Sequence, residues 1–404
     1  MLATKTAYKA LAAFCFTWLA AGCALPAKPL ASAFERADGT TLQAEDIDAT
    51  VTQLMEAGNV AGLGVALIDG SGVRYLKTYG YATQEKGTLL QASSVMYGAS
   101  LTKATFAYAV MTLVDEGRVD LDAPIADVLP QPLSDYEDYA DLADDPRWHG
   151  FTLRMLLSHT SGLPNWRWFM PGEKLTIMFE PGTRYAYSGE GIQIAQMMLE
   201  EGYGVDVAAL MQARVFDRFQ MTNTSMTWRE DFREDLARGH DKDGSNLGHY
   251  MRQSVRAAGS MDTTTADYAK FLAALLRGEG ISAGAKNEML SPQVTITSKR
   301  QFPTQFWEDT DANKAIELAY GLGWGLFTSR FGPAYFKEGH DDGWNNYALC
   351  LRDAERCLLL LSNSSNGESI FLYLADALLG ETGLPWEWEG YVPYDRAATG
   401  TSGD

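Results

Sequence analysis

Cationic side chains, histidine and cysteine are scarce in this sequence, and these shortages narrow its possible roles. The chain has 33 Lys and Arg against 52 Asp and Glu, a formal net charge of −19 over 404 residues. Proteins that bind nucleic acid need a basic face to neutralise phosphates, so this balance argues against such a partner. The five histidines and four cysteines show no metal-ligand spacing. We therefore expect no nucleic-acid partner, no metal and no cofactor.

The first residues have the pattern of an export signal. Lys5 and Lys9 precede an apolar run over 10–21 that is too short to span a bilayer. The run ends in Leu19-Ala-Ala-Gly-Cys23, which resembles a bacterial lipoprotein signal. We expect removal of 1–22, a lipid on Cys23 that anchors the protein to the membrane, and a location in the cell envelope facing the periplasm. A plain signal peptide with another cleavage site is the alternative.

The remaining chain predicts one large domain. We expect a tether over 23–40, a folded domain over 41–391 and a flexible tail over 392–404, which is rich in small and polar residues. Strand patterns occur near both ends of the domain, whereas about 120–285 is helical and rich in loops. This arrangement predicts an α/β fold with an antiparallel sheet built from N- and C-terminal strands, flanked by helices, with a helical insertion. The expected strands cover 62–68, 73–79, 323–328, 334–337, 347–351 and 357–362.

Two cysteines, Cys350 and Cys357, lie on consecutive expected strands around a polar turn. In an oxidising compartment they would form a disulfide across the two strands. Two buried free thiols are the alternative.

The leading candidate for chemistry is Ser100-Leu-Thr-Lys103, the one Ser-x-x-Lys in the chain. A spacing of three on a helix places the hydroxyl and the amine on one face. A serine hydroxyl becomes a good nucleophile when a neighbouring base takes its proton, and a lysine is such a base when burial keeps it neutral. A helix-capping serine followed by a solvated lysine would give the same pattern. The apolar sequence around Lys103 favours the catalytic interpretation.

Several segments resemble, in the same order, the serine β-lactamase and penicillin-binding family, in particular its class C branch with the related esterases. The likeness covers roughly 41–380 and implies a β-lactamase/transpeptidase-like fold. It rests on Met96-Tyr-Gly-Ala-Ser-Leu-Thr-Lys103, Leu153-Arg-Met-Leu-Leu-Ser-His-Thr-Ser-Gly-Leu-Pro164, Pro181-Gly-Thr-Arg-Tyr-Ala-Tyr-Ser-Gly189 and Tyr320-Gly-Leu-Gly-Trp324.

The resemblance assigns the second catalytic position to Tyr187, as a general base or acid that works with Lys103. A phenol near two lysines is expected to ionise more easily. The family usually has Tyr-x-Asn here, and this chain has Gly189 in place of the asparagine. Because that asparagine normally holds a substrate amide, we expect weaker amide recognition.

The third element of the family is Lys-Thr-Gly, for which this chain offers Lys242-Asp-Gly244 and Lys337-Glu-Gly339. We choose Lys337 and Gly339 because they follow an apolar strand. The resemblance then implies an oxyanion hole made by the backbone N–H groups of Ser100 and His340. Glu338 replaces a hydroxyl that helps to receive a substrate carboxylate. It either faces the site and repels that group or is turned away by strand alternation.

We therefore expect a serine hydrolase that cleaves an ester or amide through an acyl-enzyme on Ser100. A D-alanyl-D-alanine carboxypeptidase or β-lactamase is one alternative, with a peptidoglycan-type peptide as substrate in the first case. A protein that is acylated but turns over poorly, as a sensor or envelope component, is another. The aromatic residues Trp166, Trp168 and Phe169 are expected to make core or lid contacts rather than to border a substrate cleft.

Overall fold

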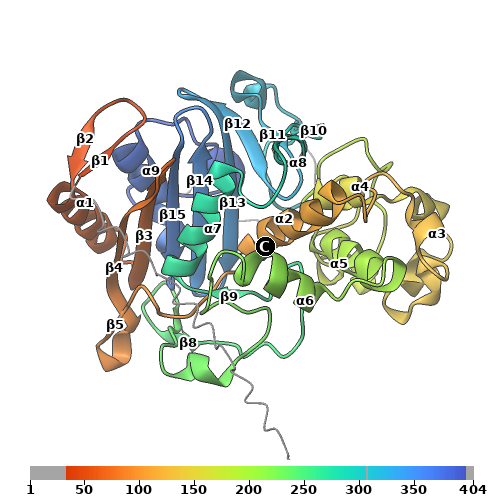
Figure 1. Ribbon diagram of the computed structural model, residues 1–404, viewed down its shortest axis with the longest axis horizontal. Coiled ribbons are helices and arrows are strands. Elements are labelled where there is room, and N and C mark those ends of the chain that lie inside the picture. Colours follow the sequence, from red (N-terminus) through yellow and green to blue (C-terminus); the bar gives the residue numbers. More distant parts are fainter. Residues whose placement is uncertain (1–32, 306–307, 397–404) are drawn as a thin grey trace, which may run out of the picture.

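A nine-stranded antiparallel sheet forms the centre of the molecule in this computed structural model, which describes residues 33–305 and 308–396 (Figure 1). Its strand order is β10-β11-β12-β13-β14-β15-β3-β4-β5, so strands from the C-terminal part lie beside β3 and β4 from the N-terminal part. The expected sheet and its assembly from both ends are confirmed. The strands are β3 (Gly62–Asp69), β4 (Gly72–Thr83), β5 (Thr88–Leu89), β10 (Val294–Thr295), β11 (Ala319–Tyr320), β12 (Gly325–Ser329), β13 (Gly332–Asp341), β14 (Trp344–Leu351) and β15 (Arg356–Ser362).

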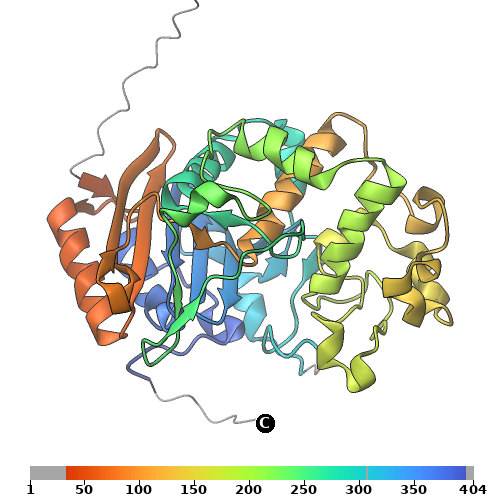
Figure 2. The same ribbon diagram turned by 90° about the horizontal axis from the view of Figure 1, so that it is seen from below.

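Both faces of the sheet are covered by helices. Successive side chains of a strand point to opposite faces, so Leu358 and Leu360 of β15 join one hydrophobic cluster while Leu359 and Leu361 join another. The first face is covered by α1 (Ala44–Ala57) and α9 (Phe371–Leu379), and the second by α2 (Leu101–Asp115) and α7 (Thr265–Arg277) (Figures 1 and 2). A sheet buried on both faces explains the nearly continuous apolar runs of its strands.

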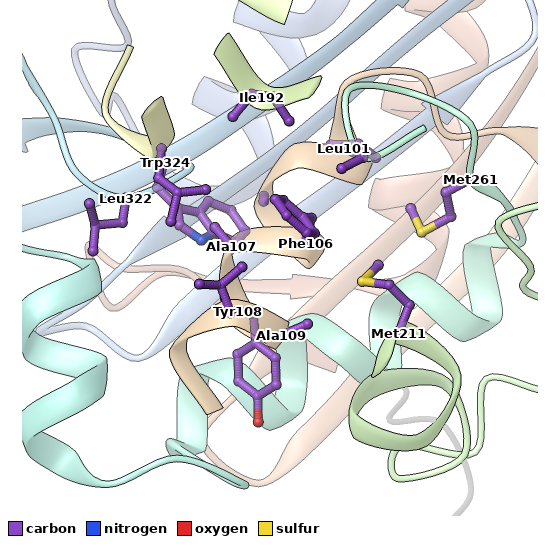
Figure 3. Close-up of a cluster of buried hydrophobic side chains, with 14 of the residues drawn as sticks. Leu101, Phe106, Ala107, Tyr108, Ala109, Ile192, Met211, Met261, Leu322 and Trp324 are labelled. Carbon is purple, nitrogen blue, oxygen red and sulfur yellow. The ribbon is translucent and has the colours of Figure 1, made fainter. Parts of the chain in front are cut away.

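Helix α2 lies between the sheet and the helical part of the molecule, and every residue from Leu101 to Leu113 is buried. Figure 3 shows Leu101, Phe106 and Tyr108 of this helix within the buried hydrophobic cluster. Two short strands, β6 (Met96–Tyr97) and β9 (Asp262–Thr263), pair just before this helix and fix where it begins. The helical part includes α3 (Ile125–Val128), α4 (Leu153–Leu157), α5 (Gly189–Met197), α6 (Val207–Met211) and α8 (Ala283–Met289). It also contains the short hairpin of β7 (Gly239–His240) and β8 (Asn246–Gly248). None of the helices in the described ranges is both long and apolar enough to cross a bilayer.

The ends of the folded part differ from the sequence-based expectation. The tether was expected to reach residue 40, but β1 (Ala33–Glu35) pairs with β2 (Thr41–Gln43), and the buried Phe34 anchors this hairpin. At the other end, the N–H of Tyr394 donates to the carbonyl of Ser369, so the first residues of the expected tail contact the domain. The expected signal over 1–22 and the lipidation at Cys23 lie outside the described residues.

Cys350 and Cys357 form a disulfide and lie directly opposite each other on β14 and β15. Both are fully buried, so of the two alternatives the structure contains the cross-strand bond. Disulfides persist in oxidising compartments, which is the environment that the expected export would provide.

The Tyr320-Gly-Leu-Gly-Trp324 segment brings the backbone of Gly323 against helix α2. Gly323 has a positive φ of 80°, and a Cβ on it would lie 2.5 Å from the Cβ of Ala107. A glycine is required here for two reasons, the left-handed backbone and the close approach to the helix. Gly117 shares the first condition (φ 69°), but a Cβ on it would have no neighbouring atom within 4 Å.

Gly323→Ala is therefore expected to lower the free energy of unfolding by about 3 kcal/mol, the sum of the left-handed backbone and the overpacking. The matched Gly117→Ala variant has the backbone cost alone, about 1 kcal/mol. Urea unfolding followed by circular dichroism measures both losses. Equal losses in the two variants would show that the contact with α2 is unimportant.

Candidate active site

Ser100 lies at the start of α2, after a tight turn in which Ala99 adopts a left-handed conformation (φ 46°). Its side chain makes no capping hydrogen bond to the helix. Instead, Ser100 Oγ is 2.9 Å from Lys103 Nζ, one turn further along the helix. The capping interpretation is thus wrong, and the expected contact between hydroxyl and amine is present.

Lys103 is almost completely buried in an apolar helix, with only 1% of its surface exposed. Its Nζ also donates to the carbonyl of Ala258 at 2.5 Å, which fixes the direction of the amine. Burial is the main reason why the pKa of Lys103 lies well below its ordinary value, and the charge of Lys337 adds to the effect. A neutral amine with a free lone pair is able to accept the proton of Ser100.

Tyr187 and Lys337 complete a cluster around the two residues of α2. Lys337, fully buried on β13, donates from Nζ to Tyr187 Oη at 3.1 Å. Burial raises the pKa of Tyr187 well above its ordinary value, Glu338 raises it further, and a hydrogen bond with Ser100 only partly offsets them. The expectation that two lysines would ease ionisation is therefore wrong in direction, because desolvation outweighs the nearby cations. Tyr187 is a neutral phenol that both donates and accepts.

Glu338 faces this cluster rather than turning away from it. It is 5% exposed, and its Oε1 accepts from Lys337 Nζ at 2.6 Å and from Gln301 Nε2 at 3.1 Å. Successive residues of a strand point to opposite faces, so the Cβ atoms of Lys337 and Glu338 lie on different faces of β13. The pairing of β13 with β12 ends at Phe336, and beyond this point the flexible side chain of Glu338 bends toward the Lys337 amine. Lys337 therefore has a carboxylate partner within the protein.

Strand β13 has a free edge beside the nucleophile. Its pairing with β12 ends at Phe336, whereas its pairing with β14 continues to Asp341, so one side from Lys337 onwards has no described strand beside it. At this edge a Cβ on Gly339 would lie 2.8 Å from the carbonyl oxygen of Gly98, so only glycine lets the strand approach the turn before Ser100. The backbone of His340 follows directly, and its side chain contacts Glu368 at 3.1 Å.

A cleft of about 870 Å³ opens over these residues. Trp166, Trp168 and Phe169 line it, so this segment borders the cleft contrary to expectation, although Trp166 also packs against the core as expected. The other lining residues that bear on the argument are Ser100, Lys103, Tyr187, Tyr250, Gln301, Phe302, Glu338, His340, Glu389 and Tyr391. Lys242, the rejected alternative to Lys337, lies in an exposed turn of the β7–β8 hairpin.

Sequence reasoning did not single out two further residues of the site. His159, fully buried, places its ring centroid 4.3 Å from that of Tyr187, and its Nδ1 accepts from the N–H of Ser188. Its signal was its position within the family-like segment 153–164. Glu389 enters the cleft wall from α10 (Trp386–Glu389), and no motif marked it. Among the described residues, no three His, Cys, Asp or Glu side chains are grouped as a metal site.

The depressed pKa of Lys103 has a consequence for stability. Between the lowered pKa of the folded chain and the ordinary pKa of the unfolded chain, the unfolded chain protonates this amine and the folded chain does not. Wild-type stability therefore rises with pH over that range, up to the unfolded pKa of about 10.4. Lys103→Met removes this dependence. We expect the stability difference, variant minus wild type, to shrink by about 1.4 kcal/mol per pH unit between the two pKa values.

Urea unfolding at pH 7 and pH 9.5 measures that difference. The exposed Lys86→Met serves as the matched control, and its difference from wild type should stay constant. If the Lys103→Met difference is also independent of pH, then burial does not depress the pKa of Lys103.

Three kinds of comparison agree on the family. The model of the family described as Beta-lactamase matches residues 47–380. A lovastatin esterase from Penicillium rubens is 28% identical over 70% of this chain and 82% of its own length, and penicillin-binding protein 4* from Bacillus subtilis is 24% identical over 74% and 67%.

Solved structures share the fold at low identity. An octameric penicillin-binding protein homologue from Pyrococcus abyssi has a TM-score of 0.68 at 20% identity, covering 84% of this chain and 78% of its own. The D-alanine carboxypeptidase AmpC from Burkholderia cenocepacia has a TM-score of 0.66 at 18% identity, covering 84% and 99%. Together with a family match over most of the sequence, these findings show that the chain belongs to the Beta-lactamase family.

Proposed function

We propose that this protein is a serine hydrolase that cleaves an ester, and less readily an amide, through an acyl-enzyme on Ser100. The observation that carries the proposal is the 2.9 Å contact between Ser100 Oγ and a buried Lys103 amine whose pKa is strongly lowered. Such a pair supplies a nucleophile and the base that activates it. This chemistry requires neither a metal nor a cofactor.

The reaction proceeds in two steps. Ser100 Oγ attacks the substrate carbonyl and gives its proton to Lys103 Nζ. The oxyanion accepts hydrogen bonds from the backbone N–H groups of Ser100 and His340. As the leaving alcohol or amine departs it takes a proton from the Tyr187 hydroxyl, which recovers one from Lys103, while Lys337 holds Tyr187 in place. Water then attacks the acyl-enzyme by the reverse proton route and releases the acid.

Two features favour a neutral ester over the family's carboxylate-bearing amides. Gly189 provides no side chain to hold a substrate amide. Glu338 pairs with Lys337 at 2.6 Å, so the positive charge of the lysine is already compensated and does not attract a substrate carboxylate. The esterase among the relatives is consistent with this choice.

A D-alanyl-D-alanine carboxypeptidase or β-lactamase is the second candidate. The hydrogen bond between Lys337 and Tyr187 and the penicillin-binding relatives support it. A third candidate, from a different class, is a protein that is acylated but released slowly. Turnover of a nitrophenyl ester, a cephalosporin and a D-Ala-D-Ala peptide, each measured with its acylation burst, separates the three.

A labelled fluorophosphonate should modify the protein once, at Ser100, because this reagent reacts covalently with activated serines. Ser100→Ala should abolish labelling and lower ester turnover by at least about 1,000-fold. The exposed Ser71→Ala is the control and should behave as wild type. Peptide mapping by mass spectrometry locates the label, and a label on any other serine rejects the proposed nucleophile.

Glu338→Thr should increase the relative rate on carboxylate-bearing substrates, because it leaves the positive charge of Lys337 free for the substrate and supplies a hydroxyl. We expect the ratio of kcat/KM for a monomethyl succinate ester to that for its dimethyl ester to rise about tenfold. Glu338→Gln removes the charge alone and should give an intermediate ratio. An unchanged ratio in both variants would mean that Glu338 does not act on substrate charge.

A further inference from the structure

At position 189 the family usually has an asparagine, and in this protein the space for that side chain is filled by another residue. Gly189 is the first residue of α5, and a Cβ on it would lie 2.5 Å from Cη2 and 2.6 Å from Cζ2 of Trp166. Real Cβ atoms essentially never come this close to another heavy atom, so the indole occupies the volume that a side chain at position 189 would need. Trp166 and Gly189 are therefore a matched pair, and neither an asparagine nor an alanine fits while the ring stays in place.

The segment that carries Trp166 is fixed to the first turn of α5. On one side, the Asn165 side chain accepts from the N–H of Gly189 at 3.1 Å. On the other side, the Arg167 guanidinium binds both carboxylate oxygens of the buried Glu190, at 2.9 and 2.8 Å. A bidentate pair of this kind defines both position and orientation. The backbone that carries the Trp166 ring is thus held on both flanks.

The indole forms one wall of the site next to the nucleophile. Lys103 Nζ lies 6.0 Å from its ring centroid, and Trp168 stacks on it at 4.8 Å with an angle of 11° between the planes. Phe169 contacts the edge of Trp168. We call Trp166 and Trp168 the tryptophan platform.

Exposed aromatic side chains are concentrated at the mouth of the same cleft. Of the nine large apolar side chains exposed within the described residues, four line it: Trp168, Phe169, Tyr250 and Phe302. Trp168 and Phe169 are 52% and 54% exposed. A cluster of exposed apolar surface around a cavity marks a ligand site.

We propose that the tryptophan platform binds an aromatic ring, or a similarly flat apolar group, of the ester that Ser100 cleaves. This inference rests on the proposed function and names the substrate class of the same site. Offset stacking on an indole suits a planar ring better than an amide or a carboxylate. The absence of a side chain at Gly189 leaves room for the Trp166 ring beside the nucleophile. Glu338 already forms an ion pair with Lys337, which would otherwise attract a charged substrate.

Three small esters test the proposal by pH-stat titration: ethyl acetate has no ring, ethyl phenylacetate has one on the acyl side, and benzyl acetate has one on the alcohol side. Trp166→Ala should lower kcat/KM for at least one ring-bearing ester about tenfold more than for ethyl acetate. The affected ester identifies the side that the platform binds. Trp166→Phe should retain most of the preference.

Gly189→Ala provides an independent variant, because its methyl group displaces the indole without removing it, and it should lower the same preference. The exposed Trp168→Ala does not threaten folding and should give a smaller change in the same direction. Tyr81→Ala removes an exposed aromatic residue outside the cleft and should leave all three rates unchanged.

Equal losses for the three esters in the Trp166, Trp168 and Gly189 variants would overturn the platform while leaving the hydrolase intact. Failure of the proposed function gives a different result: wild type and Ser100→Ala would then hydrolyse the esters at the same rate. The two failures are therefore distinguishable in one set of assays.

Discussion

The contact between the Lys103 amine and the Ser100 hydroxyl depends on the exclusion of water, and the architecture around helix α2 provides this exclusion. An amine in water is protonated at neutral pH and accepts nothing. Here the helix is buried along nearly its whole length between the sheet and the helical region, so the amine loses its hydration. Gly323 and Gly339 help to exclude water, because the absence of a side chain lets their backbones pack closely against α2 and against the turn before it.

Burying one amine creates a second electrostatic problem, because Lys337 is buried beside it. Glu338 compensates the charge of Lys337 by forming an ion pair with it inside the protein. The pair keeps a net charge off the centre of the site and allows Tyr187 to remain a neutral phenol. A buried pair of this kind is costly to break, since removing one partner leaves the other charge without compensation. Substrate preference and the electrostatic balance of the site are therefore coupled.

Local patterns were sufficient to predict part of the fold. The strand over 357–362 and the helix after Ser100 could be predicted because both are nearly continuous apolar runs that end at a turn. Helix α1 was missed although Ile47, Val51 and Met55 recur at a spacing of four. Strand β1 was assigned to the tether because its stability comes from Phe34 packing on a distant part of the core.

In the site, too, some features could be predicted from local patterns and others depended on distant contacts. The spacing of three predicted that Ser100 and Lys103 lie together, and the family resemblance implied that Tyr187 and Lys337 join them. The direction of the Tyr187 pKa was not, because it depends on how completely the site is dehydrated. The position of Trp166 was also inaccessible, since only the folded chain shows that its ring covers Gly189. Sequence patterns do not show where a flexible side chain lies relative to residues that are distant in the sequence.

The free edge of β13 has a consequence for how the protein behaves among its own copies. An unpaired strand edge is a template on which another chain can add a strand, and natural proteins protect such edges with charged side chains. This edge begins with Lys337 and Glu338 and ends with Asp341. Lys337 and Glu338 are buried in the cleft wall, so only the end of the edge at His340 and Asp341 is open to another chain. The charge of Asp341 is therefore the one that opposes the addition of a strand from a second copy.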